Sequence, residues 1–166
     1  MTAPAGPPVR RVQIAVAGAS ACGVRVARLA EAVGRALAAA DAVVVCGGRG
    51  GVMEAVARGV AGAGGIVVGL LPGYDRQAGN RHLTVVLPTG LGWARNTLVA
   101  AAGDALIALP GRDGTRSEIA LARVLGCPVV SLGRRDERLP GVRKAATPEE
   151  AVRRALAAAR RRLAGC

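Results

Sequence analysis

Two kinds of segment alternate along the chain: short runs that are apolar throughout, and longer stretches in which apolar residues recur every three or four positions. The apolar runs have the length and the Val, Ile and Leu content of buried β-strands, and each is followed by Gly or Pro. We expect six strands, at residues 12–17, 42–46, 66–71, 83–87, 105–109 and 128–132. Strands without polar alternation are typical of a parallel sheet that is covered on both faces.

Helices are expected in the intervals between these strands. The first two are indicated by apolar residues at helical spacing, Val26, Ala30, Val33, Leu37 and then Val52, Val56, Val60. Others are expected at residues 91–102 and 116–125 and from Thr147 onward, where Thr147, Pro148 and Glu150 form a capping box. The alternation predicts an α/β fold: a doubly wound, mostly parallel, Rossmann-like sheet with helices on both faces.

The 166 residues fit one domain. Residues 1–11 are rich in Pro, Ala and Gly and are expected to form a flexible tail, so that the domain spans residues 12–164. The tail lacks the charged and apolar regions of a signal peptide, and no apolar run reaches membrane-spanning length. We therefore predict a cytoplasmic protein that does not associate with a membrane.

Cysteine and histidine are too sparse and too scattered for a metal cluster. The four cysteines include no CxxC pair, and His82 is the single histidine, so no metal site is expected. Cys46 and Cys127 lie in apolar stretches and are predicted to be reduced core residues.

The net charge of +12 raises the question of nucleic-acid binding. The arginines are spread along the chain, with one cluster at residues 153–162, and aromatic residues make up only 1% of the chain. Proteins that bind single strands usually stack bases on aromatic rings. We expect no specific nucleic-acid binding and favour a small anionic ligand.

Glycine-rich segments follow the ends of several predicted strands, at residues 18–20, 47–51, 89–92 and 110–115. Parallel strands end at one edge of a sheet, so these segments converge on a crevice of the kind in which α/β sheets bind ligands. Glycine lets the backbone approach an anion, and the helices that follow direct free N–H groups toward it. We predict a site for a phosphate-bearing small molecule, above all a nucleotide. The alternative is that these glycines only form tight turns.

The segment from Thr115 to Glu118 has two interpretations. As T-x-x-E it is a capping box at a helix start, with Thr115 as the N-cap and Glu118 reaching back. The same geometry places a carboxylate at the mouth of the crevice, where it is useful if a cationic transition state must be stabilised.

Two motifs and one arginine resemble the Lonely Guy (LOG) family of lysine-decarboxylase-like proteins. Residues 110–118, PGRDGTRSE, resemble the family motif PGGxGTxxE, and residues 47–55, GGRGGVMEA, resemble GGxxGLMG. Arg95 lies fifteen residues before Pro110, as the family's catalytic arginine does. The resemblance extends over residues 12–132.

Active members of the family are similar to phosphoribohydrolases, which release a nucleobase from a nucleoside 5′-monophosphate. The resemblance implies hydrolysis of an N-glycosidic bond with Arg95 and Glu118 as the catalytic pair and without a required cofactor. It also implies a homodimer, for which an exposed apolar helix face around Leu98 and Leu121 would be suitable. The implied ligand and phosphate contacts are Gly18, Ser20, Gly47, Gly48, Gly51, Met53, Glu54, Asn96, Gly111, Gly114 and Thr115.

Three positions depart from the family pattern. Arg112 replaces the second glycine of PGG, Glu54 replaces the glycine after the methionine, and Asn96 replaces a lysine after the arginine. The segments GVMEA, ARN and GTxSE resemble a subgroup that includes molybdenum-cofactor carrier proteins, which bind a pterin phosphate without needing to catalyse a reaction. Retention of Arg95 and Glu118 favours an enzyme. The three departures favour a carrier or sensor of a phosphorylated pterin, with molybdenum cofactor as the bound ligand.

Overall fold

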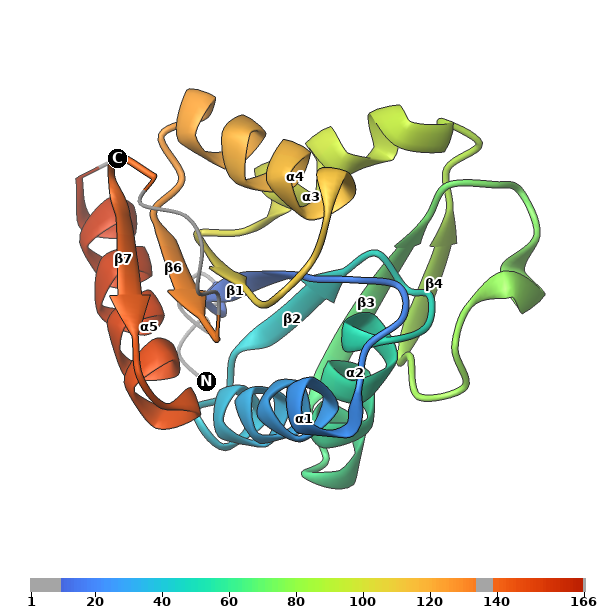
Figure 1. Ribbon diagram of the computed structural model, residues 1–166, viewed down its shortest axis with the longest axis horizontal. Helices are drawn as coiled ribbons and strands as arrows, with labels where there is room; N and C mark the ends of the chain where they lie inside the picture. The colour runs from blue at the N-terminus through green and yellow to red at the C-terminus, as the bar shows by residue number, and fades with distance from the viewer. Residues whose placement is uncertain (1–9, 134–138, 166) are drawn as a thin grey trace, which may run out of the picture.

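The computed structural model describes residues 10–133 and 139–165. In this part of the chain, seven mutually parallel strands form one sheet in the order β4-β3-β2-β1-β5-β6-β7 (Figure 1). The strands are β1 (Gln13–Ala17), β2 (Val43–Cys46), β3 (Ile66–Leu71), β4 (Val85–Pro88), β5 (Ala105–Ala108), β6 (Val129–Leu132) and β7 (Val142–Ala145). The helices are α1 (Val24–Ala39), α2 (Val52–Gly62), α3 (Arg95–Ala102), α4 (Asp113–Val124) and α5 (Pro148–Ala164), with 3-10 turns η1 (Arg76–Ala78) and η2 (Gly92–Ala94).

Helices cover both faces of the sheet, with α1, α2 and α5 on one face and α3 and α4 on the other (Figure 1). Successive residues of a strand point to opposite faces. In β1, Ile14 and Val16 pack in the core beneath α1, α2 and α5, whereas Ala15 and Ala17 pack in the core beneath α3 and α4. All four are at most 1% exposed, which explains why all four are apolar. The expected doubly wound α/β fold is confirmed.

The direction of winding reverses beside β1. From β1 the chain proceeds outward through β2, β3 and β4, and it then returns through α3 to β5, on the other side of β1. In open α/β sheets, the carboxyl ends of the two strands at such a reversal diverge and leave a crevice between their loops. The loops after β1 and β5 therefore occupy the position where this fold binds ligands.

Helices α1 and α2 approach each other closely because each has a glycine at the crossing. A Cβ atom on Gly34 would collide with the carbonyl oxygen of Val56, and a Cβ atom on Gly59 would collide with that of Glu31. This packing fixes the position of α2, whose first turn borders the crevice.

Some boundaries differ from the expectations. Strand β7 was not expected, because its sequence VRKA exposes Arg143 and Lys144 at the edge of the sheet and has no apolar run. Strand β4 spans Val85–Pro88, and the expected helix at residues 91–102 divides into η2 and α3. At α5, one half of the expected capping box is present: the Thr147 hydroxyl accepts a hydrogen bond from the Glu150 N–H at 3.1 Å. The Glu150 carboxylate accepts a hydrogen bond of 2.7 Å from the N–H of Ala146, the residue before the N-cap, and not from Thr147 itself.

Contacts extend into the segment expected to be a tail, although residues 1–9 lie outside the described residues. Arg10 donates a 2.7 Å hydrogen bond to the Asp104 carboxylate, whose second oxygen accepts one of 2.8 Å from the Gln13 N–H. None of the helices that the structure describes is both long and apolar enough to cross a lipid bilayer.

Candidate ligand-binding and active site

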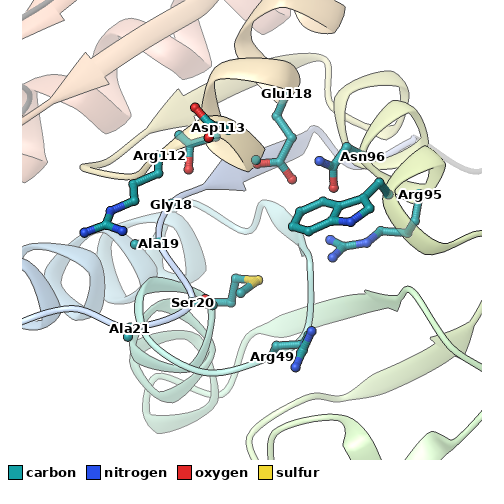
Figure 2. A pocket seen from close by; sticks show the side chains of 14 residues that line it. Gly18, Ala19, Ser20, Ala21, Arg49, Arg95, Asn96, Arg112, Asp113 and Glu118 are labelled. Atoms are coloured by element: carbon teal, nitrogen blue, oxygen red, sulfur yellow. The ribbon is translucent and has the colours of Figure 1, made fainter.

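A cavity of about 500 Å³ lies at the carboxyl ends of β1, β2 and β5 (Figure 2). Its size is in the range of sites for small molecules. Its walls come from the loops after these strands, from η2, and from the first turns of α2, α3 and α4. The lining residues are Gly18, Ala19, Ser20, Ala21, Arg49, Met53, Trp93, Arg95, Asn96, Arg112, Asp113, Gly114, Thr115 and Glu118. The predicted crevice is therefore present.

The loops after β1, β2 and β5 are joined to one another at Ala19. The Ala19 N–H donates a 3.0 Å hydrogen bond to the Pro110 carbonyl, and the Ala19 carbonyl accepts one of 2.9 Å from the Val52 N–H. Gly51 has a φ of +64°, and a Cβ atom there would collide with the backbone of Ala19 and Ser20. Only glycine fits this approach, and the walls of the cavity are held in place before any ligand binds.

Arg95 and Glu118 bring two buried charges to the cavity. Arg95 is the first residue of α3 and is 7% exposed, and Glu118 lies in the second turn of α4 and is 6% exposed. Figure 2 shows both charged groups directed into the cavity. Within the described residues they form no ion pair with each other, and the Arg95 Nε atom has no hydrogen-bond partner. Both groups are therefore available to a ligand.

Burial changes the acidity of both groups. It raises the pKa of Glu118 to about 7, although the nearby Arg95 opposes this shift. Burial also lowers the pKa of Arg95, and the Glu118 carboxylate acts against that change. Arginine nevertheless remains a cation at neutral pH. The cavity thus contains a permanent cation beside a carboxyl group that exchanges its proton near pH 7.

The start of α4 corrects the interpretation of Thr115 as an N-cap. The helix begins at Asp113, so Thr115 is its third residue, and the N-cap is Arg112, whose side chain makes no capping hydrogen bond. Glu118 lies a full turn beyond the helix start and cannot reach back to it. The capping box of Thr115 and Glu118 is therefore wrong. The first turn of α4 instead lines the cavity, so that the positive end of the helix dipole meets the ligand site.

The predicted ligand residues divide into two groups. Besides Arg95 and Glu118, the residues that line the cavity are Gly18, Ser20, Met53, Asn96, Gly114 and Thr115. Those that do not line it are Gly47, Gly48, Gly51, Glu54 and Gly111.

The glycines of the second group make room for their neighbours. A Cβ atom on Gly47 would collide with the Arg95 guanidinium and the Met53 sulfur, and one on Gly111 would collide with the Thr115 hydroxyl. Their absent side chains let Arg95, Met53 and Thr115 reach the cavity.

Several lining residues were not expected as ligand contacts: Ala19, Ala21, Arg49, Trp93, Arg112 and Asp113. Arg112 lies in the segment 110–115 that was expected to reach the crevice, and by itself it was named as a departure from the family motif. Arg49 lies inside the predicted glycine-rich loop, so its position was a usable signal. With Arg95, the cavity has three arginines against the carboxyl groups of Asp113 and Glu118, a balance that suits an anionic ligand.

Two of the cysteines, Cys46 and Cys127, lie in the core. Cys46 and Cys127 are free thiols, 0% and 3% exposed, which confirms the prediction that they are reduced core residues. Burial raises the pKa of both thiols to about 11. In the described residues, His, Cys, Asp and Glu form no group of three or more that could hold a metal ion.

The face expected to make a dimer contact is only partly exposed. Leu98 is 39% exposed, whereas Leu121 is half-buried and packs against the core beneath α3 and α4. The homodimer stays a prediction.

Comparison with known proteins gives relatives of two kinds. An uncharacterized protein of Archaeoglobus fulgidus is 40% identical over 144 residues, which are 87% of this chain and 94% of that protein. A cytokinin riboside 5′-monophosphate phosphoribohydrolase of Rhodococcoides fascians is 34% identical over 122 residues, or 71% of this chain and 62% of that protein.

Among solved structures, a molybdenum cofactor binding protein of Rippkaea orientalis has a TM-score of 0.83 and 30% identity, covering 90% of this chain and 98% of that one. The molybdenum cofactor carrier protein of Chlamydomonas reinhardtii has a TM-score of 0.81 and 30% identity, covering 93% of this chain and 99% of that one. The model of the SLOG cluster4 family matches residues 11–159. The chain therefore belongs to the SLOG cluster4 family, which is LOG-like.

Proposed function

We propose that this protein binds a nucleoside 5′-monophosphate in the crevice and hydrolyses its N-glycosidic bond. The observation that carries the proposal is that Arg95 and Glu118 are both buried against one cavity and are not paired with each other. Buried charges are costly unless they have a partner. A ligand with groups complementary to both side chains would supply those partners.

The phosphate group would bind at the first turn of α4 and at the loop after β1. Gly114 and Thr115 line the cavity at a helix N-terminus without a side-chain cap, and Gly18 and Ser20 line it from the loop opposite. Backbone N–H groups and the positive end of the helix dipole favour a phosphate there. Arg112 adds a positive charge to the same region of the wall.

The chemistry would need only the chain's own residues and water. The bond between C1′ and the base nitrogen breaks, the electron pair leaves with the base, and the ribose becomes oxocarbenium-like. A water oxygen then bonds to C1′ and one water proton goes to Glu118. The departing base takes up a proton from solvent water, and Glu118 returns its own proton to solvent, so that the net reaction consumes one water molecule. The ionised Glu118 would also stabilise the developing positive charge. A pKa of about 7 suits a group that accepts a proton at neutral pH.

Arg95 would hold the ligand rather than transfer a proton. Its guanidinium is planar and offers several donors in fixed directions, so it can bind two ligand oxygens at once. Asn96 beside it lines the same wall. The phosphoribohydrolase relative acts on a riboside 5′-monophosphate, which supports this substrate class.

A second candidate is a carrier or sensor of a phosphorylated pterin, with molybdenum cofactor as cargo. It is favoured by the molybdenum cofactor binding and carrier proteins, which match this chain over almost their whole length. Arg112 at the cavity wall and Asn96 after Arg95 are departures from the hydrolase motif that point the same way. The two candidates share the anion site and differ in whether a bond breaks.

One experiment separates the candidates. The protein is incubated with a panel of nucleoside 5′-monophosphates, and free base is measured by chromatography, with Glu118→Gln as the matched control. Binding of the same compounds is measured by calorimetry. We expect release of at least one base by the parent and loss of release in the variant. If the parent binds these nucleotides but releases no base, the hydrolase proposal is contradicted and the carrier proposal remains.

A further inference from the structure

We propose that Trp93 is the platform on which the planar heterocycle of the ligand stacks, and that it selects for ligands with such a ring. The inference rests on the proposed function for the site. It goes further because it assigns the ring end of the ligand to a residue outside the LOG-like motifs. It applies to a purine, a pyrimidine or a pterin alike, since these rings share a flat π-face.

The indole ring of Trp93 is exposed to solvent, although a large apolar ring is more stable when it is buried. Trp93 is the only tryptophan in the chain, its side chain is 82% exposed, and it lines the cavity. A large aromatic ring gains much from burial. Among the described residues that line the cavity, Trp93 is the only aromatic one, and apart from Met53 the others are small, polar or charged. A flat ring that stacked on the indole would remove this apolar surface from water.

The backbone holds Trp93 between the groups proposed to act on the ligand. Turn η2 is anchored by the Gly92 N–H, which donates a 2.9 Å hydrogen bond to the Pro72 carbonyl after β3. Arg95 follows two residues later. A Cβ atom on Gly114 would lie 3.5 Å from the Trp93 ring. The indole therefore lies beside the first turn of α4, where we place the phosphate, and close in sequence to Arg95.

This arrangement divides recognition of the ligand between two chemistries. Backbone N–H groups and arginines bind the phosphate end of the ligand, and they can bind any sugar phosphate in this way. The aromatic face of Trp93 stacks on a flat ring and makes no hydrogen bonds to the edge of that ring, so it accepts any base, because every base has a π-face. Ligands with a ring should therefore bind far more tightly than ribose 5-phosphate.

Because Trp93 is the only tryptophan, its fluorescence reports on its own contact. Tryptophan emission is followed while AMP or ribose 5-phosphate is added to the full-length protein, and the affinity of each is measured separately by calorimetry. We expect saturable quenching by AMP with the calorimetric affinity, and no quenching by ribose 5-phosphate. Trp93→Ala should weaken AMP binding about 10- to 100-fold and leave ribose 5-phosphate binding unchanged. Trp93→Phe should restore most of the affinity for AMP.

Tyr74→Ala is the matched control, because Tyr74 is 84% exposed and does not line the cavity. It should bind both compounds as the parent does. Equal AMP affinity in the parent and Trp93→Ala would overturn the proposal. So would a change in molecular mass by light scattering in Trp93→Ala alone, because Trp93 would then be covered by a second copy of the chain. If neither AMP nor ribose 5-phosphate binds to the parent, the proposed function of the crevice fails, and the stacking proposal fails with it.

Discussion

The side-chain amide of Asn96 donates a 2.8 Å hydrogen bond to the hydroxyl of Ser117, and this bond joins α3 to α4 directly beside the two buried charges. Asn96 follows Arg95 and Ser117 precedes Glu118. The Ser117 hydroxyl in turn donates a 2.7 Å hydrogen bond to the Gly114 carbonyl. The three residues form a brace from one wall of the cavity to the other, which fixes Arg95 relative to Glu118. The predicted ligand residue Asn96 thus lines the cavity and also positions its neighbours.

Breaking this brace should affect both stability and the site. In Asn96→Ala, we expect the free energy of unfolding to fall by roughly 1 kcal/mol, the typical net contribution of one hydrogen bond. Base release should fall because Arg95 and Glu118 lose their fixed relation. Urea unfolding and base release of Asn96→Ala, Ser117→Ala and the double variant would measure the coupling. Fully additive effects on both quantities would contradict the brace.

Glu118→Gln tests the charge at this position while keeping its shape. Because the capping box is excluded, the carboxylate has no helix-capping role to lose. We expect base release to fall on the order of a hundredfold or more, about 3 kcal/mol of transition-state stabilisation. Circular dichroism and binding of ribose 5-phosphate should remain as in the parent. Unchanged base release would remove Glu118 from the mechanism.

Stability should decrease as the pH rises from about 4.5 to 7. Burial raises the pKa of Glu118 in the folded protein to about 7 from an ordinary value of 4.5. Between these values the folded state holds a proton that the unfolded state has released, so raising the pH favours unfolding. The free energy of unfolding should therefore fall by on the order of 3 kcal/mol, and this decrease is complete above about pH 7.

Urea unfolding of the parent and Glu118→Gln at several pH values isolates this contribution, since the variant lacks the titrating group. The stability of the parent relative to the variant should decline from pH 4.5 to 7 and then level off. A difference that does not change with pH would show that Glu118 has an ordinary pKa.

Much of this fold follows from where its residues must be buried. β1, β2, β5 and β6 are covered on both faces, so apart from Gln13 and Ser131 their sequences are apolar runs that are readable without a structure. β7 lies at the edge, where Arg143 and Lys144 are exposed, and it leaves no such signal. The start of α4 was misplaced because Thr115 and Glu118 have the spacing of a cap although a different residue begins the helix.

The site was predictable to the extent that topology determines it. Parallel strands bring the loops containing Gly18, Gly47 and Gly114 to one edge whatever their side chains are. Which residues face the cavity depends on local turns. Trp93 was missed because it lies outside the glycine-rich segments and the family motifs from which the site was predicted. It lies in η2, a short turn whose Gly92 N–H donates a hydrogen bond to the Pro72 carbonyl.

Gly114→Val should weaken phosphate binding without unfolding the protein. A Cβ atom at this position meets only ordinary contact, 3.5 Å from the Trp93 ring, so the fold has room for it. The side chain would enter the cavity at the first turn of α4, where the anion must approach. We expect the affinity for ribose 5-phosphate to fall at least about tenfold, measured by calorimetry. Gly62→Val, also at a helical glycine with an open surrounding but away from the cavity, is the control. Equal affinity in both variants would place the phosphate elsewhere.

Removing Arg95 should act on Glu118 as well as on the ligand. The Arg95 cation holds down the pKa of the buried Glu118 carboxyl, so Arg95→Ala should raise that pKa further above its ordinary value. If the ionised carboxylate is the active form, the base-release rate of the parent rises through about pH 7 and then levels off. In Arg95→Ala, the same rise should occur at higher pH and reach a lower plateau, because the ligand oxygens have also lost a donor.

The double variant Arg95→Ala, Glu118→Gln should lose less activity than the sum of the single losses, since the two groups act as a unit. The measurement is the pH profile of base release for the parent, both single variants and the double variant. An unshifted profile in Arg95→Ala would show that the two charges do not influence each other, and the proposed catalytic pair would then be two independent ligand contacts.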